Sequence, residues 1–344
     1  MKINNFDIST LGSAIVYFRH GFFFIALVAL LNTDQKFIRY FFYSILICFL
    51  ILILDGFYQY FNGKNIIGLE TPDKNRVSSF FHEEMILGSY LSRLWPIFFG
   101  LSIFIIKQKK MATYLCILII ILSYVLIFLS GDRAAFFNVN LSLIIILLFT
   151  KKYFKFKLIT FLSSFFLIFI ITFINPTAKQ RVFDQTINQL TADYDENRTL
   201  YIFSKDHTHH YITAYRMFLD QKIFGVGMKN FRYLCNEKKY ESNKDSCATH
   251  PHNTYIQVLA ELGLVGLLFL LILFFYYIKS LFKHMLLKFK GKNYFSDFEI
   301  CCLSGIAIYL WPFIPTGNFF TNWLSILMFL NIAVFLYAKN IRKF

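Results

Sequence analysis

The chain has 344 residues, of which 57% are hydrophobic, 20% are aromatic and only 16% are charged. A soluble domain carries about 25% charged residues, so this composition excludes an ordinary soluble enzyme and indicates a membrane protein. The net charge of +15 is also compatible with nucleic-acid binding, but the basic residues stand between apolar segments and do not alternate with aromatic stacking positions. We therefore expect no nucleic-acid partner.

Apolar segments recur along the chain at the length that a helix needs to cross a bilayer, about 17–25 residues. The first segment contains Arg19 and His20, and no small-residue cleavage site follows it, so it does not read as a removed signal peptide. The pattern predicts an all-α polytopic membrane protein with nine spans: Leu11–Leu31, Phe37–Leu54, Met85–Ile106, Thr113–Leu129, Ala134–Thr150, Leu158–Ile174, Tyr255–Ile278, Phe298–Ile314 and Phe319–Ala338.

Lysine and arginine clusters indicate the orientation of these spans. If the spans alternate, the clusters at 107–110, 151–157, 279–292 and 339–343 lie on one side, which is cytoplasmic by the positive-inside rule. The chain then divides into helices over 1–174, a large outer loop over 175–254 and helices over 255–344. The N-terminus also falls outside, which predicts either a re-entrant first segment or a missing upstream segment.

The outer loop has the composition of a folded region. It is rich in tyrosine and phenylalanine, and Ile212–Leu219 reads as an amphipathic helix with Ala214, Met217 and Phe218 on one side. Gly225-Val226-Gly227 then breaks the chain. Cys235 and Cys247 are the only cysteines in a polar loop, and an outside loop is oxidising, so we predict a disulfide between them, with two free thiols as the alternative.

The segment His250-Pro251-His252-Asn253 precedes the seventh span. Pro251 disfavours helix at His250, and Asn253 or Thr254 is suited to cap the helix that follows. His252 would then lie at a helix N-terminus, where the positive end of the helix dipole lowers the pKa of an imidazole. A neutral histidine at the membrane surface is a candidate general base.

A helix that continues from Thr254 gives each of the following residues a defined face. At 100° per residue, Gly263 and Gly266 fall on the face of His252 and predict a smooth surface for a helix or a lipid chain. Glu261 falls on the opposite face, where we expect it to be buried and paired with a basic group.

The motif of His252-Asn253, nine residues and then Gly263-Leu-Val-Gly266 resembles the O-antigen ligase family of bacterial membrane glycosyltransferases. Further resemblance lies in Ala214–Phe231, with its Gly-x-Gly, in Ser130-Gly-Asp-Arg133-Ala134 and in Arg76–Phe80. Together these segments cover roughly residues 70 to 275.

The resemblance implies a membrane glycosyltransferase-C-like fold in the bacterial inner membrane, with the large loop periplasmic, and a role in lipopolysaccharide and cell-envelope biosynthesis. It implies a glycan donor on undecaprenyl pyrophosphate, a lipid A–core or other glycan acceptor, membrane lipids as surroundings, and no metal or other cofactor. His252 would be the catalytic base, and Arg133 and Arg76 would bind the pyrophosphate, with Asn253, Glu261, His207 and His250 in support.

One position departs from the family pattern. Seven residues before Ala214 the family often has an arginine, and this chain has His207. Arg198, Arg216 and Arg232 could replace that arginine, and we favour Arg216.

Each assignment has a structural alternative. His252 could serve only in helix capping, Arg133 could pair with Asp132, Arg216 could extend to the membrane surface, and Arg76 could contact lipid headgroups. The histidines could instead bind zinc, although no acid or thiol completes a familiar spacing: His207, His209, His210, His250 and His252. Asp193-Tyr-Asp195 resembles a metal-binding triplet but reads as a solvated acidic loop.

Three classes of function remain open from the sequence. The first is the O-antigen ligase, the second is an O-antigen polymerase or a protein O-oligosaccharyltransferase with the same donor, and the third is a polysaccharide transporter. Against transport, the sequence has no internal repeat and no matched pair of broken helices.

Overall fold

The computed structural model describes residues 8–34, 36–73, 76–106, 110–151, 154–174, 179–184, 187, 204–244 and 246–342. In that part of the chain the regular structure is helical, apart from one isolated bridge between Lys64 and Glu70. Six helices there are long and apolar enough to cross a membrane. The protein is therefore a polytopic all-α membrane protein, as predicted.

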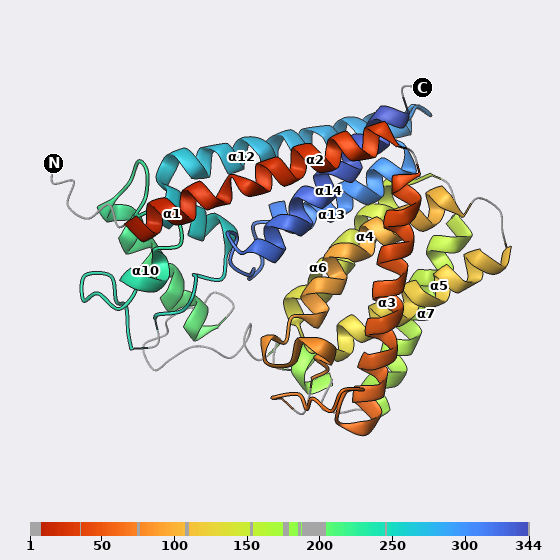
Figure 1. The fold of residues 1–344 in the computed structure, drawn as a ribbon, viewed down its shortest axis with the longest axis horizontal. Coiled ribbons are helices and arrows are strands. Elements are labelled where there is room, and N and C mark those ends of the chain that lie inside the picture. The colour runs from red at the N-terminus through yellow and green to blue at the C-terminus, as the bar shows by residue number, and fades with distance from the viewer. Residues whose placement is uncertain are drawn as a thin grey trace. The chain divides into compact units, whose positions relative to one another are not determined.

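The helices follow the predicted apolar segments closely (Figure 1). Their bounds are α1 Ile8–Tyr17, α2 Arg19–Thr33, α3 Phe37–Asn62, η1 Ser79–Glu84, α4 Leu87–Ile105, α5 Lys110–Leu129, α6 Arg133–Phe149, α7 Phe154–Ile174, η2 Gln180–Asp184, α10 Lys205–Asp220, α11 Phe231–Leu234, α12 Thr254–Phe289, α13 Asp297–Leu310 and α14 Asn322–Ile341.

One of the predicted spans is shorter as a helix than a full crossing. α6 has 17 residues and α7 has 21, which is within the range that a span needs. α13 has 14 residues and ends at Leu310, four residues before the predicted end of that span. Pro312 explains this end, because a proline disfavours helical conformation in the residue before it, here Trp311.

The chain forms two compact units, which are described separately. Unit 1 comprises Met1–Ala26, Ile187–Lys283 and Tyr309–Leu330, and unit 2 comprises Leu27–Thr186, His284–Ile308 and Asn331–Phe344.

In unit 2, α4 contacts α3, α5 and α6, and α5 also contacts α3 and α7 (Figure 1). Trp95 of α4 is fully buried among them, and its indole N–H donates to the Ile120 carbonyl at 3.2 Å.

Helix α3 continues eight residues beyond the predicted end at Leu54. The extension carries two buried polar side chains, Asp55 and Gln59, which accept hydrogen bonds from the loop that follows. Asp55 accepts from the Ile66 amide at 2.8 Å and from the Ser79 hydroxyl, and Gln59 Oε1 accepts from the amides of Ser78 and Ser79. The sequence placed Asp55 outside the membrane span because it is charged, but its partners are supplied by protein.

Unit 1 contains a small core of its own beneath α10. The core consists of buried residues from α10, α11, the following turn and α12: Ala214, Met217, Phe231, Cys235, Tyr240 and Ala260. Ala214 and Met217 lie on the buried face of α10, as the amphipathic pattern predicted. Cys235 and Cys247 form a disulfide, with their Cα atoms 5.0 Å apart. The predicted pairing is confirmed.

Helix α12 is broken at Gly263, where φ is +65° and ψ is −158°. The break frees backbone groups that bond to the segment before α11. The amides of Val226 and Gly227 donate to the carbonyls of Ala260 and Glu261, at 2.9 and 3.0 Å. The amides of Leu264 and Val265 donate to the carbonyls of Lys222 and Ile223, at 2.8 and 3.2 Å. The 222–227 segment is thus hydrogen-bonded to α12 on both sides of the break.

The predicted smooth glycine face is therefore wrong. It assumed a regular helix through Gly263, but the helix is interrupted there and receives the backbone of Gly225. A Cβ atom at Gly263 would lie 2.4 Å from the Ile223 carbonyl oxygen, and a Cβ atom at Gly225 would lie 2.4 Å from the Glu261 carbonyl carbon. Gly266 faces side chains of its own helix, with Leu262 Cβ 2.4 Å from where its Cβ would stand.

Candidate functional site

Four imidazole rings gather at the N-terminus of α12 in unit 1. The ring of His252 lies 4.1 Å from His250, 5.3 Å from His207 and 5.4 Å from His210, between ring centroids. His207 and His210 come from α10, and His250 and His252 come from the segment before α12. These four residues are called the histidine cluster below.

His252 has an unusual backbone, with φ at +55°. A non-glycine residue in this region carries strain and persists where its surroundings hold it. Its carbonyl accepts from the Thr316 amide at 2.8 Å. The next residue, Asn253, caps α12, since its Oδ1 accepts from the amides of Tyr255 and Ile256 at 3.0 and 3.1 Å. The predicted cap is confirmed, and it fixes the backbone position of His252, the residue directly before it.

The second bond of the Asn253 amide group ties this corner to the 311–321 segment. Asn253 Nδ2 donates to the Pro312 carbonyl at 2.8 Å, and Thr254 and Thr316 share a hydroxyl bond of 3.0 Å. The helix N-terminus is therefore held by the connection that leads into α14.

His250 is fixed in one neutral form by its two bonds. Its Nε2 lies 3.1 Å from the Thr316 carbonyl, which can only accept, so Nε2 carries the proton. Its Nδ1 then accepts from the Thr249 hydroxyl, 2.9 Å away. Burial lowers the pKa of His250 to about 4, and the charge of Arg232 also lowers it.

His252 is also neutral at physiological pH. Burial, together with the neighbouring imidazoles of His250, His207 and His210, lowers the pKa of His252 to about 3. The part of the chain that the structure describes offers no hydrogen-bond partner to the ring nitrogens of His252. One ring nitrogen of a neutral imidazole has a lone pair, so His252 can accept a proton from a bound group.

The phase of α10 decides which of its histidines face His252. Ser204 caps the helix, accepting from the His207 amide at 3.2 Å and lying 2.6 Å from His207 Nδ1. His207 and His210 are three residues apart and share one face, whereas His209 turns away to the Ser242 hydroxyl at 3.1 Å. The sequence did not select His210 as a site residue, although the spacing of three residues was a signal for it.

Glu261 lies on the other side of α12 and is fully buried. Its carboxylate accepts from the amides of Lys229 and Phe231 at 3.0 and 3.1 Å and from Gln257 at 3.2 Å. Gln257 in turn donates to Asn318 at 2.8 Å. The sequence predicted a basic partner, but neutral N–H groups occupy both carboxylate oxygens. Glu261 thus holds the 229–231 turn against α12.

The arginines proposed for the pyrophosphate differ in their surroundings. Arg216 is exposed and donates to the carbonyls of Tyr240 and Glu241. Arg232 is half-buried, its charge acts on His250, and its buried Nε has no hydrogen-bond partner among the described residues. Arg198 lies outside the described residues, as do Asp193 and Asp195. Within unit 1, Arg232 is therefore the better placed cation, and the preference for Arg216 has no support in its contacts.

Arg76 and Arg133 belong to unit 2. Arg76 donates to the carbonyls of Ser130 and Met85, at 2.8 and 3.2 Å, and thereby holds the turn that leads into α6. Arg133 is the first residue of α6, whose N-terminus is capped by Asp132 through a 3.0 Å bond from the Ala135 amide. The Asp132 carboxylate thus serves as a helix cap. Gly88 of α4 packs against this turn, where a Cβ would lie 3.2 Å from Asp132 Cβ.

Comparison with known proteins adds one match. A family model described as O-antigen ligase matches residues 117–271, a segment that contains Arg133, Arg232 and the histidine cluster. The predicted resemblance to this family is therefore confirmed over that segment, which makes up 155 of the 344 residues. Among curated proteins, no match is found.

Proposed function

We propose that this protein is an O-antigen ligase-like glycosyltransferase of the bacterial inner membrane, with its large loop in the periplasm. It would move a glycan from undecaprenyl pyrophosphate to a lipid A–core acceptor without a metal or another cofactor. The observation that carries the proposal is the neutral His252, which has an open ring nitrogen, a strained backbone and a place inside the matched family segment.

In the proposed reaction, a ring nitrogen of His252 takes the proton of an acceptor sugar hydroxyl. The hydroxyl oxygen attacks the anomeric carbon of the glycan, and the bond between that carbon and the pyrophosphate oxygen breaks. Undecaprenyl pyrophosphate leaves with the bonding electron pair. Attack from the side opposite to the leaving group inverts the anomeric carbon.

A base with a pKa of about 3 is weak, so the substrate has to strengthen it. A bound pyrophosphate supplies the means, because a nearby negative charge favours the protonated imidazole and raises its pKa. Burial beside three other imidazoles keeps His252 unprotonated until the donor arrives. The base therefore becomes effective when the substrate that it serves is in place.

Arginine side chains are suited to the leaving group, since a guanidinium is planar, always charged and able to form two parallel bonds to a phosphate. We assign this role to Arg133 and to Arg232, which replaces Arg216. Arg76 would position Arg133 by holding the Ser130 turn. His207, which occupies the position of a family arginine, would contribute an N–H donor beside His252.

The alternatives within the family share this donor chemistry and differ in the acceptor. An O-antigen polymerase would extend a lipid-linked glycan, and a protein O-oligosaccharyltransferase would use a serine or threonine hydroxyl. A polysaccharide transporter would need no base, so activity independent of His252 would favour it.

The test is glycan transfer by purified protein in detergent. Wild type, His252→Ala and the control His209→Ala are incubated with undecaprenyl-pyrophosphate glycan and lipid A–core in the presence of a chelator. We expect a ladder of ligated product from wild type and His209→Ala, and a loss of about 10²–10⁴-fold in rate for His252→Ala, the usual contribution of a general base. Lengthened lipid-linked glycan without ligation would identify a polymerase. Equal rates for wild type and His252→Ala would contradict the proposed role.

A further inference from the structure

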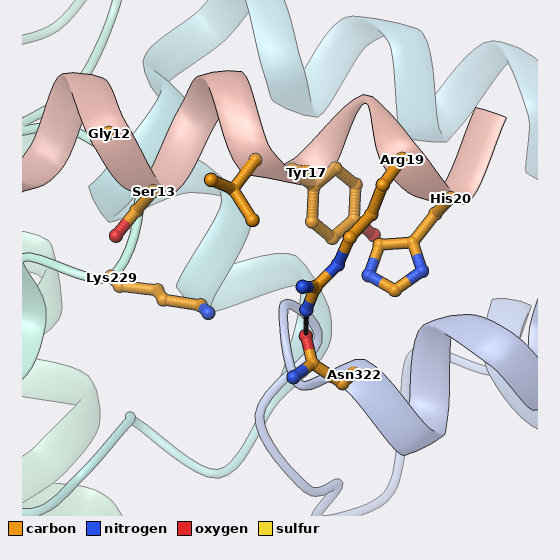
Figure 2. Close-up of a pocket in the computed structure, with 8 residues that line it drawn as sticks. Gly12, Ser13, Tyr17, Arg19, His20, Lys229 and Asn322 are labelled. Carbon is orange, nitrogen blue, oxygen red and sulfur yellow. Dashed lines mark hydrogen bonds between the residues drawn. The ribbon is translucent and has the colours of Figure 1, made fainter. Parts of the chain in front are cut away.

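A second polar site lies in unit 1, in a pocket of about 320 Å³. It is lined by residues of α1, α2, the 227–230 turn and the first residue of α14: Gly12, Ser13, Val16, Tyr17, Arg19, His20, Lys229 and Asn322. None of these residues belongs to the histidine cluster. Figure 2 shows Arg19 and Lys229 extending into the same space from opposite walls.

The pocket carries two cations without an anion to match them. Arg19 donates to the Asn322 side chain, which uses one of its five N–H donors. Neither Arg19 nor Lys229 forms an ion pair with any carboxylate in the described part of the chain. Two cations facing one cavity repel each other, and a bound anion would relieve that repulsion.

A buried imidazole also lines the pocket, and one of its two ring nitrogens has no partner in the described part of the chain. His20 is 3% exposed, and its Nε2 has no hydrogen-bond partner among the described residues. Its ring is held by Tyr17, 5.0 Å away, and Phe329, 6.4 Å away, between ring centroids. Tyr17 is anchored in turn by a 3.0 Å bond to Ser325. The imidazole is thus fixed in place beside Arg19 with a nitrogen left to serve a ligand.

Lys229 lies close enough to two arginines to be affected by their charges. Burial lowers the pKa of Lys229, and the charges of Arg232 and Arg19 lower it further. Its backbone is held by Glu261, which accepts from the Lys229 amide at 3.0 Å and whose negative charge partly offsets the effect of the two arginines. Lys229 also has a positive φ of +64°, so the turn holds it in a conformation that few side chains adopt.

The pocket lies against an apolar helix surface at the start of a membrane span. Asn322 begins α14, and Val16 of the pocket wall is exposed. Ile15 on α1, Phe22 on α2 and Phe18 between the two helices are exposed as well. A soluble anion would gain nothing from that surface, whereas the chains of a lipid would cover it. The two cations, Arg19 and Lys229, and the apolar surface of α1 and α2 together fit a ligand with a phosphate at one end and hydrocarbon at the other.

We propose that this pocket binds the phosphate group of a membrane amphiphile, held by Arg19 and Lys229 with His20 and Ser13 as further polar partners. The proposal goes beyond glycan transfer, because it assigns a binding site outside the histidine cluster and is tested by binding alone.

The experiment measures binding to the full-length protein in a neutral detergent by isothermal titration calorimetry. Three probes separate the sources of phosphate: dioctanoyl phosphatidic acid, the neutral dioctanoyl glycerol and inorganic phosphate. The variants are Arg19→Gln, Lys229→Gln, the double variant and Lys238→Gln, an exposed lysine of the same unit that serves as control. Gly12→Phe tests the cavity without changing charge, because nothing lies within 4 Å of a Cβ at Gly12 and the residue lines the pocket.

We expect saturable binding of phosphatidic acid that weakens at least about tenfold in the double variant and in Gly12→Phe, and that is unchanged in Lys238→Gln. Phosphatidic acid binding that survives both the double variant and Gly12→Phe would overturn the site. Inorganic phosphate that binds as tightly as phosphatidic acid would overturn the lipid assignment. Equal binding of dioctanoyl glycerol would overturn the role of the phosphate.

Discussion

Gly225 and Gly263 approach so closely that neither position has room for a side chain. Both have positive φ, and a Cβ on either would stand 2.4 Å from backbone atoms of the facing segment. The four backbone hydrogen bonds around this contact hold the 222–227 turn against α12 on both sides of its break. Close approach and backbone conformation therefore both require glycine here, and substitution can separate the two requirements.

Gly263→Ala should lower the thermal unfolding midpoint more than Gly291→Ala. Both glycines have positive φ, but open space surrounds Gly291, so its substitution bears only the conformational strain of about 1–3 kcal/mol. Gly263→Ala adds a backbone clash to that strain. Scanning fluorimetry of the two purified variants gives the comparison, and equal shifts would show that the close approach costs little.

Removing the disulfide should destabilise the outer loop. The bond joins cysteines separated by 12 residues, and closing such a short ring contributes about 3 kcal/mol in the chain-entropy view. Wild type should therefore lose thermal stability when dithiothreitol is added, and Cys235→Ser/Cys247→Ser should start at the lower value and show no response. A double variant that still responds to the reductant would place the effect at another cysteine.

The histidine cluster should make stability depend on pH. His250 and His252 have pKa values lowered from 6.5 to about 4 and about 3, so below pH 6.5 the unfolded chain binds more protons than the folded protein. Stability from these groups is complete above pH 6.5 and is lost as pH falls toward 4. Unfolding midpoints measured from pH 8 to pH 4.5 should fall, and should fall less in His250→Gln/His252→Asn. A slope that the double variant leaves unchanged would contradict the burial of these imidazoles.

Glu261→Gln should destabilise the protein although it preserves shape. The glutamine amide would direct two donors at a place where the amides of Lys229 and Phe231 already donate. A buried donor left without an acceptor costs about 1–3 kcal/mol. Glu237→Gln is the matched control, since Glu237 is exposed and forms only a 3.6 Å pair with Lys239. Chemical denaturation of both variants measures the difference, and equal effects would show that Glu261 has no special role in the turn.

Arg76→Gln should loosen the turn before α6. The arginine donates to the carbonyls of Ser130 and Met85, and losing bonds from a charged donor costs about 1.5–3 kcal/mol. Hydrogen exchange of the amides near residues 128–132 should become faster, while exchange in α14 should not change. Unchanged exchange at the turn would argue that Arg76 acts on the substrate and not on the fold.

Most of the helical framework could be predicted from the sequence, because apolar runs of bilayer length leave few alternatives. The Asn253 cap and the disulfide could also be predicted from the sequence. The cap follows from the residues next to the helix start, and the disulfide follows from the two cysteines of the polar loop. The break at Gly263 was not, because it depends on a backbone partner forty residues earlier, which no periodicity records. The extension of α3 was missed for a related reason, since Asp55 reads as a loop residue until its partners Ile66 and Ser79 are known.

In the candidate site, too, features set by local sequence could be predicted, and features set by distant partners could not. His252 and its position at a helix start were visible in local sequence, whereas the arrangement of His207 and His210 around it required the phase of α10. The choice between Arg216 and Arg232 also depended on tertiary structure, because only contacts distinguish an arginine that holds a turn from one beside His250.

The break in α12 also separates a covered part of the helix from an exposed apolar part. Before Gly263 none of the large apolar side chains of this helix is exposed, whereas from Leu264 onward exposed ones recur: Leu264, Val265, Leu268, Phe269, Ile272, Leu273, Phe275 and Tyr276. The stretch Leu264–Phe289 measures about 39 Å at 1.5 Å per residue, which is enough to cross the hydrocarbon of a bilayer. The first turns of α12 therefore pack against protein, and the exposed apolar stretch after the break is the part of the helix that is suited to contact lipid.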